Sequence, residues 1–235
     1  MNPDDRLAIV AEAAGTAALL AVVVGSGIMG ERLDAGNTAV ALLANSLATG
    51  AGLYVLISIL GPISGAHFNP AVSVIFWWRG DISGPKFSAY VLAQVLGAIA
   101  GVWIAHAMFD LSVLQTSEKV RTGLGQWLSE AVATSGLLAT ILLGLRANTK
   151  AIPALVAAYI TAAYWFTAST SFANPAVTIA RSLTNTFSGI RAMDAPGFVA
   201  AQAVAVLVVA AALRANRHIG TESKKMTPTP SGNVP

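Results

Sequence analysis

The sequence predicts an all-α membrane protein with six transmembrane helices and two re-entrant half-helices in an inverted 3+3 repeat. Three observations support this prediction. The chain of 235 residues is 55 % hydrophobic and 11 % charged, whereas soluble domains carry roughly a quarter charged residues. Its apolar runs are mostly near the roughly 20 residues that cross a bilayer as a helix. The tetrapeptide Asn-Pro-Ala-Val also occurs twice.

The apolar runs define the expected spans. They are Leu7–Met29, Ala39–Gly61, Phe87–Phe109, Trp127–Leu145, Ala151–Ala168 and Gly197–Leu213. The first run is expected to stay in the mature chain, because "MNPDDR" lacks the basic leader of a signal peptide and the run carries Glu12.

An internal repeat divides the spans into two sets of three. Three polar landmarks occur twice in the same order: Glu12 and Glu130, Asn69 and Asn174, and Gln94 and Gln202. We therefore expect one channel-like domain over residues 1–213, with repeat one at about 7–109 and repeat two at about 126–213. Because each repeat has an odd number of spans, the second must be inserted upside down relative to the first.

Each Asn-Pro-Ala segment is predicted to start a half-helix. Proline at the first helical position has a suitable φ and no N–H to satisfy, and asparagine before it is a good N-cap. The two starts are then expected to meet near the bilayer midplane and to direct their positive dipole ends at one point. The residues of this centre are Asn69, Pro70, Ala71, Asn174, Pro175 and Ala176.

Buried polar side chains are needed to hold the two loops that enter the membrane. Glu12 and Glu130 are interpreted as acceptors for loop N–H groups, and His67 as a further hydrogen-bonding brace. The alternative for the glutamates is a proton relay. No metal or cofactor site is expected, because the chain has no cysteine and its three histidines are scattered. No Ser-His-Asp set is seen, so an enzyme is not expected.

The basic residues predict the orientation in the membrane. Nine lysines and arginines fall on the side of the termini and five on the opposite side, which favours cytoplasmic termini. There is no basic stripe typical of a nucleic-acid surface. Residues 214–235 are polar and contain proline, so we expect a disordered cytoplasmic tail.

The two boxes resemble those of the aquaporin, or major intrinsic protein, family, and "SGAHFNPAVS" matches the family's first box nearly unchanged. The resemblance implies the aquaporin fold in a bacterial inner membrane and a homotetramer with a pore in each subunit. It also implies a selectivity filter at Thr49, Ala162, Ser171 and Val177. In span five, the alternative is that Tyr164 or Phe166 faces the pore.

The resemblance implies a wide filter, because Val177 stands where the family usually has arginine. Such a filter suits polyols, urea-like solutes and metalloid hydroxides, with some water. The second box, "SFANPAVTIARSLTNTF", is similar to an arsenic-resistance branch whose cargo is neutral arsenous acid. Arg181 lies one helical turn beyond Val177. It is expected either to take over part of the missing charge, or to cap a carbonyl or lie near the membrane surface.

Two other functions remain open at this point. One is an ordinary facilitator of water and glycerol. The other is an ion-coupled secondary transporter, since inverted repeats with broken helices also occur in that class.

Overall fold

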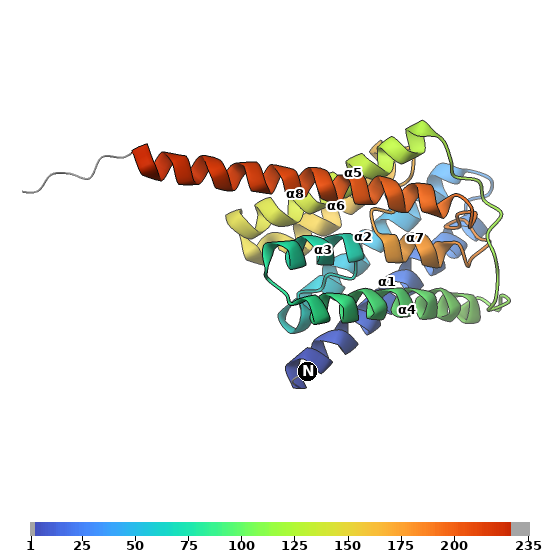
Figure 1. The fold of residues 1–235 in the computed structure, drawn as a ribbon. Helices are drawn as coiled ribbons and strands as arrows, with labels where there is room; N and C mark the ends of the chain where they lie inside the picture. The colour runs from blue at the N-terminus through green and yellow to red at the C-terminus, as the bar shows by residue number, and fades with distance from the viewer. Residues whose placement is uncertain (1–2, 227–235) are drawn as a thin grey trace, which may run out of the picture.

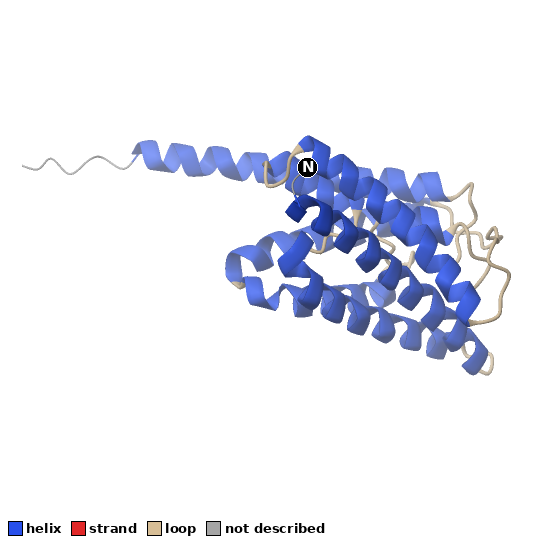
Figure 2. Ribbon diagram, turned by 90° about the horizontal axis from the view of Figure 1, so that it is seen from below, coloured by secondary structure: helices blue, strands red, loops and turns tan. Residues whose placement is uncertain are grey.

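The computed structural model describes residues 3–226, and the side chains up to 215. This part of the chain is helical and contains no strand (Figure 2). Its elements are α1 (Pro3–Leu33), α2 (Thr38–Ser64), α3 (Pro70–Arg79), α4 (Gly84–Met108), α5 (Leu124–Ala147), η1 (Thr149–Ala151), α6 (Ile152–Phe166), α7 (Pro175–Arg181) and α8 (Ala195–Met226).

The helices form two similar sets, as the repeat in the sequence predicts. In the first set α1 packs against α2 and α4, and in the second α5 packs against α6 and α8. The short helices α3 and α7 complete the two sets and contact each other in the middle of the molecule, where Figure 1 shows them end to end between α4 and α8. Helix α2 joins the sets by packing on α6. The result is an aquaporin-type fold.

Within the described residues, five helices are long and apolar enough to cross a membrane: α1, α2, α4, α5 and the Ala195–Ala215 part of α8. The remaining predicted span, the fifth along the chain, is α6, which has only 15 residues and a length of about 22 Å at 1.5 Å per residue. It is shorter than the apolar run because η1 occupies the start of the run and Thr167 already has extended backbone.

Close packing of α1 on α4 depends on two glycines. A Cβ atom at Gly97 would lie 2.3 Å from the carbonyl oxygen of Ala13, and one at Gly101 would lie 2.1 Å from that of Ala17. The two helix backbones therefore touch along this small-xxx-small pair.

Helix α8 is longer than the sequence predicts. It runs to Met226, so residues 214–226 are helical where a disordered tail is expected. The run from Leu213 to Met226 contains no proline, the residue that most strongly breaks a helix. Residues 227–235 lie outside the described part of the chain.

Candidate functional site

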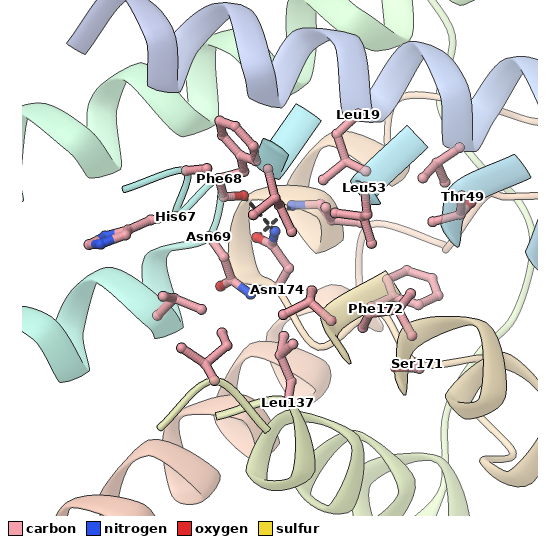
Figure 3. Close-up of a pocket in the computed structure, with 18 of the residues that line it drawn as sticks. Leu19, Thr49, Leu53, His67, Phe68, Asn69, Leu137, Ser171, Phe172 and Asn174 are labelled. Carbon is pink, nitrogen blue, oxygen red and sulfur yellow. Dashed lines mark hydrogen bonds between the residues drawn. The ribbon is translucent and has the colours of Figure 1, made fainter. Parts of the chain in front are cut away.

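A cavity runs through the middle of the helices and encloses about 790 Å³ between its lining atoms, including space open to solvent. Much of its wall is apolar and comes from α1, α2, α5 and α6, with residues such as Leu19, Leu53, Leu137 and Ile160. Its polar side chains come mostly from the two re-entrant loops and the half-helices that follow them, with Thr49 from α2 and Tyr164 from α6. Figure 3 shows the central part of this cavity.

At the centre of the cavity, two half-helices begin with the same cap. The Asn69 side-chain oxygen accepts from the Ala71 N–H at 2.9 Å, and that of Asn174 accepts from the Ala176 N–H at 2.9 Å. Each proline occupies the first turn, where a missing N–H costs nothing. The positive ends of α3 and α7 thus point at the same region.

The two asparagines also tie the repeats together. Asn69 donates through Nδ2 to the carbonyl of Ala173 at 2.8 Å, and Asn174 donates to the carbonyl of Phe68 at 2.7 Å. Figure 3 shows both asparagines at the centre of the cavity. An amide nitrogen carries two hydrogens, so each asparagine has a second hydrogen that these bonds do not use.

Glu12 lies behind the first loop and is fully buried. Its carboxylate accepts from the backbone N–H groups of His67 at 2.9 Å and Phe68 at 2.7 Å. Ser64 Oγ and Gln94 Nε2 donate to the same carboxylate at 2.6 and 2.7 Å. Through these four bonds the carboxylate holds the loop backbone and two neighbouring side chains in place. Glu12 does not line the cavity.

Glu130 repeats this arrangement behind the second loop. It accepts from the N–H groups of Phe172 at 2.8 Å and Ala173 at 2.9 Å, and from Gln202 Nε2 at 2.7 Å. Like Glu12, it is absent from the cavity wall. A proton relay needs carboxylates along the conducting path, so this geometry favours bracing of the loops.

The glutamine in each repeat has a second hydrogen-bond partner, a hydroxyl group that sequence reasoning missed. Gln94 Nε2 also donates to Ser73 Oγ at 3.0 Å, and Gln202 Nε2 donates to Thr178 Oγ1 at 2.9 Å. Ser73 and Thr178 each lie four residues after the asparagine of their repeat. That shared offset is the signal in the sequence that identifies them.

Both loops use left-handed backbone at matching places. Ala66 and Phe68 have φ of 48°, and the corresponding Ser171 and Ala173 have φ of 50° and 48°. This conformation costs non-glycine residues about 1–2 kcal/mol each. The hydrogen bonds to the two glutamates fix the loops in spite of that cost.

His67 lies in the first loop and faces the cavity. Its Nδ1 is 3.0 Å from Ser73 Oγ, and its ring packs on the rings of Phe76 and Tyr90 at centroid distances of 4.5 and 5.5 Å. The side chain therefore connects the loop to α3 and α4.

Three of the four predicted filter residues line the cavity: Thr49 from α2, Ser171 from the second loop and Val177 from α7. Figure 3 shows Thr49 and Ser171 on the same side of the two asparagines. Arg181 lines the cavity as well, and its Nε donates to the carbonyl of Ser188, which agrees with the alternative that it caps a carbonyl.

The prediction for Ala162 is wrong. Ala162 is exposed on the outside of α6, whereas Val156, Ile160 and Tyr164 line the cavity. These three are four residues apart and share one face, while a residue two positions from Ile160 points about 200° away. Tyr164 lines the cavity where Ala162 was expected, and its hydroxyl is 3.3 Å from Thr49 Oγ1. Phe166, the other alternative, is 57 % exposed.

Two basic side chains of the loop before α5 donate to carbonyl groups of the second re-entrant loop and of the segment after α7. Arg121 donates to the Gly189 carbonyl at 2.9 Å and lies over the Phe172 ring at 5.3 Å. Lys119 donates to the Phe187 carbonyl at 2.8 Å. Burial, together with the charge of Arg121, lowers the pKa of Lys119 to about 8. Burial also lowers the pKa of Arg121.

Comparison with known proteins identifies the family. The model of the major intrinsic protein family matches residues 3–167. Aquaglyceroporin AqpS of Rhizobium meliloti (strain 1021) is 62 % identical over 205 residues, which cover 87 % of this chain and 88 % of that protein. The lens fiber major intrinsic protein of Gallus gallus is 36 % identical over 75 residues, which cover 32 % of this chain and 29 % of that protein.

A solved structure has the same fold. The X-ray structure of the aquaglyceroporin from Plasmodium falciparum aligns with a TM-score of 0.64 over 87 % of this chain and 97 % of that chain, at 18 % identity. The family model covers well over half of the sequence, and the helices have the arrangement of a member. The chain belongs to the major intrinsic protein family.

Proposed function

We propose that the protein is a passive channel for small neutral solutes, with a filter wide enough for polyols and arsenous acid as well as water. The observation that carries the proposal is Val177 in the wall of the cavity, in a filter whose other members are Thr49, Tyr164 and Ser171. The similarity to a protein named an aquaglyceroporin supports the same class of solute.

The centre of the cavity suits neutral solutes. The N-terminal ends of α3 and α7 supply positive partial charge there, so a hydronium or metal cation is repelled. Asn69 and Asn174 each have an amide hydrogen left to donate to a hydroxyl oxygen. We assign the six residues of the two Asn-Pro-Ala segments to this centre.

The filter suits solutes that are bulkier than water. Val177 contributes an apolar surface, and Thr49 and Ser171 contribute small hydroxyl side chains. A polyol has carbon atoms for the apolar wall and hydroxyl groups for the polar atoms. Arsenous acid is a neutral triol of similar size, so the same filter is suited to it.

Two alternatives differ in their expected behaviour. An ordinary facilitator of water and glycerol, with a narrower filter, would pass arsenous acid much more slowly relative to water than the wide filter proposed here. An ion-coupled transporter would need ionisable groups on the solute path, but Glu12 and Glu130 are both directed at loop backbone. The glutamates therefore support the channel.

We also propose a homotetramer in the cell inner membrane, with cytoplasmic termini and a single channel domain over residues 1–213. The excess of lysine and arginine on the side of the termini supports this orientation.

Solute flux into proteoliposomes tests the proposal. Uptake of water, glycerol, urea and arsenous acid is compared between vesicles with the protein and empty vesicles. We expect faster uptake of all four, without saturation and without an effect of a proton gradient. Arsenous acid entering no faster than into empty vesicles would exclude it as a solute, and saturable uptake driven by the gradient would favour a transporter.

A further inference from the structure

A groove on the outside of the helices lies apart from the central cavity. It has a volume of about 680 Å³, including space open to the surroundings. One face of α1 and the end of α4 form its walls, with the residues Ala21, Val22, Gly25, Ser26, Met29, Met108 and Phe109. None of these residues lines the cavity through the middle of the helices.

Two small residues make room for this groove, which we call the α1–α4 groove. Ala21 and Gly25 lie four residues apart and so share one face of α1. A Cβ atom at Gly25 would lie 3.4 Å from the ring of Phe109. A larger side chain at either position would therefore occupy part of the groove.

The walls of the groove suit hydrocarbon. Ser26 is the polar residue among them, and its hydroxyl donates to the Val22 carbonyl at 2.6 Å and accepts from Asn45 Nδ2 at 2.9 Å. Its hydrogen-bonding groups are therefore already paired. Met29 and Met108 are both exposed, and their flexible side chains can adapt to an irregular apolar ligand.

An arginine is fixed at one end of the groove. Arg32 follows Met29 by three residues and so lies on the same face of α1. Its Nη2 donates to the carbonyl of Phe109 at 3.0 Å, and its guanidinium carbon lies 5.0 Å from the centroid of the Phe109 ring. Phe109 thus belongs to the wall of the groove and also supports Arg32.

The charge of Arg32 is available to a ligand. The side chain is exposed, and no salt bridge to it occurs in the described part of the chain. A guanidinium carries five N–H donors in a fork that matches a phosphate group. The bond to Phe109 uses one of these donors and leaves the others for an anion.

The length of the groove matches the hydrocarbon of one lipid leaflet. Met29 follows Ala21 by eight residues, which is about 12 Å at 1.5 Å per residue. The hydrocarbon core of a bilayer is about 30 Å thick, so one leaflet contributes about 15 Å. The apolar run of α1 ends at Met29, and the charged Glu31 and Arg32 follow. Arg32 therefore lies at headgroup depth when the groove lies at acyl-chain depth.

We propose that the α1–α4 groove and Arg32 form a binding site for one phospholipid of the leaflet on the side away from the termini. The phosphate binds Arg32, and an acyl chain lies in the groove. A phospholipid supplies both an anionic oxygen and hydrocarbon, whereas inorganic phosphate supplies only the first. The inference does not depend on which solutes pass through the channel.

The two parts of the site contribute differently to binding. Bulk lipid is as apolar as the groove, so the acyl chain gains close contacts and no further escape from water. Arg32 supplies the preference between headgroups. A lipid with a net negative charge should bind more tightly than a zwitterionic one, whose phosphate already has a cation of its own nearby.

Native mass spectrometry of the purified protein, titrated with single lipids, tests the inference. The probes are phosphatidylglycerol and phosphatidylcholine with the same acyl chains, and inorganic phosphate alone. We expect wild type to bind its first phosphatidylglycerol roughly threefold to tenfold more tightly than phosphatidylcholine. Arg32→Gln should remove this preference, and Arg32→Lys should retain part of it. Inorganic phosphate should not compete with the lipid.

The groove has its own variant. Ala21→Leu should weaken the binding of both lipids by a similar factor, roughly threefold or more, because the larger side chain occupies the place of the acyl chain. The matched controls are Arg146→Gln, an exposed arginine at the end of α5, and Ala200→Leu, an exposed alanine of α8. Both controls should bind the two lipids as wild type does.

Several results would overturn the inference. Equal preference for phosphatidylglycerol in Arg32→Gln and Arg146→Gln would remove Arg32 from the site, and equal binding by Ala21→Leu and Ala200→Leu would place the acyl chain elsewhere. Competition by inorganic phosphate would show that the groove contributes nothing. A changed number of subunits in Ala21→Leu would show that a second copy of the chain covers the groove. If Ala21→Leu does not fold, the headgroup preferences of wild type and the Arg32 variants still decide the matter.

Discussion

Replacing Glu130 with glutamine should destabilise the second re-entrant loop. Three donors converge on this carboxylate: the N–H groups of Phe172 and Ala173 and the side-chain amide of Gln202. Glutamine keeps one acceptor oxygen and puts an NH₂ group in place of the other. In the best orientation, the retained oxygen accepts from Ala173 and Gln202, and the Phe172 N–H then faces another donor.

The magnitude follows from these three bonds. One orphaned buried N–H costs about 1–3 kcal/mol, and the two remaining bonds each weaken by about 0.5–1 kcal/mol without the charge of the acceptor. We therefore expect Glu130→Gln to lower the free energy of unfolding by about 2–5 kcal/mol. Water conduction should fall in the same variant, because the carbonyl oxygen of Ala173 accepts the hydrogen bond that orients the Asn69 side chain.

Thermal unfolding of the purified protein in detergent, followed by tryptophan fluorescence, measures the first effect, and stopped-flow shrinkage of proteoliposomes measures the second. Glu118→Gln is the matched control, because Glu118 is exposed in the loop before α5. If Glu130→Gln unfolds at the same temperature as Glu118→Gln and conducts water equally fast, Glu130 does not support the loop.

Two further predictions concern packing and pH. Gly101→Ala should lower the unfolding temperature, because the added Cβ would lie 2.1 Å from the carbonyl oxygen of Ala17. Gly61→Ala is the control and should not lower it, because no atom lies within 4 Å of a Cβ at Gly61. Equal unfolding temperatures for the two variants would contradict the close contact of α1 and α4. The pKa of Lys119 is lowered from 10.5 to about 8 in the folded protein. Between pH 8 and 10.5, Lys119 is therefore mostly neutral in the folded state and still protonated in the unfolded state, so the free energy of unfolding should rise with pH across this range. Denaturant titrations across that range should show a smaller rise for Lys119→Gln, and identical pH dependence would contradict the shift.

Much of the fold follows from the repeated landmarks in the sequence. The apolar runs predict the long helices, and the Asn-Pro pairs predict where α3 and α7 begin. Both features can be read from the sequence because each depends only on neighbouring residues in the chain. The contacts between Asn69 and Ala173 and between Asn174 and Phe68 join the two repeats. Those contacts depend on how the loops turn, and the sequence indicates only that the two starts meet.

The filter shows where sequence reasoning fails. The resemblance implies Ala162 in the filter, but the loop of residues 167–174 separates Ala162 from the second Asn-Pro-Ala segment. The phase of α6 is set by how that loop returns to the helix, and a small change in length turns a different face to the cavity. Tyr164 lies on the correct face. The position of Arg181 was equally undetermined, because a side chain at the end of a short helix can point along the wall or out of it.

The relative permeability of the Val177→Arg channel tests the central claim most directly. Water, glycerol and arsenous acid fluxes are compared in proteoliposomes for wild type, Val177→Arg and Val177→Leu, which adds bulk without charge. If Val177 keeps the filter wide, Val177→Arg should cut glycerol and arsenous acid flux roughly tenfold more than water flux, and Val177→Leu should have a smaller effect. Equal losses for water, glycerol and arsenous acid in Val177→Arg would contradict the assignment of Val177 to the filter.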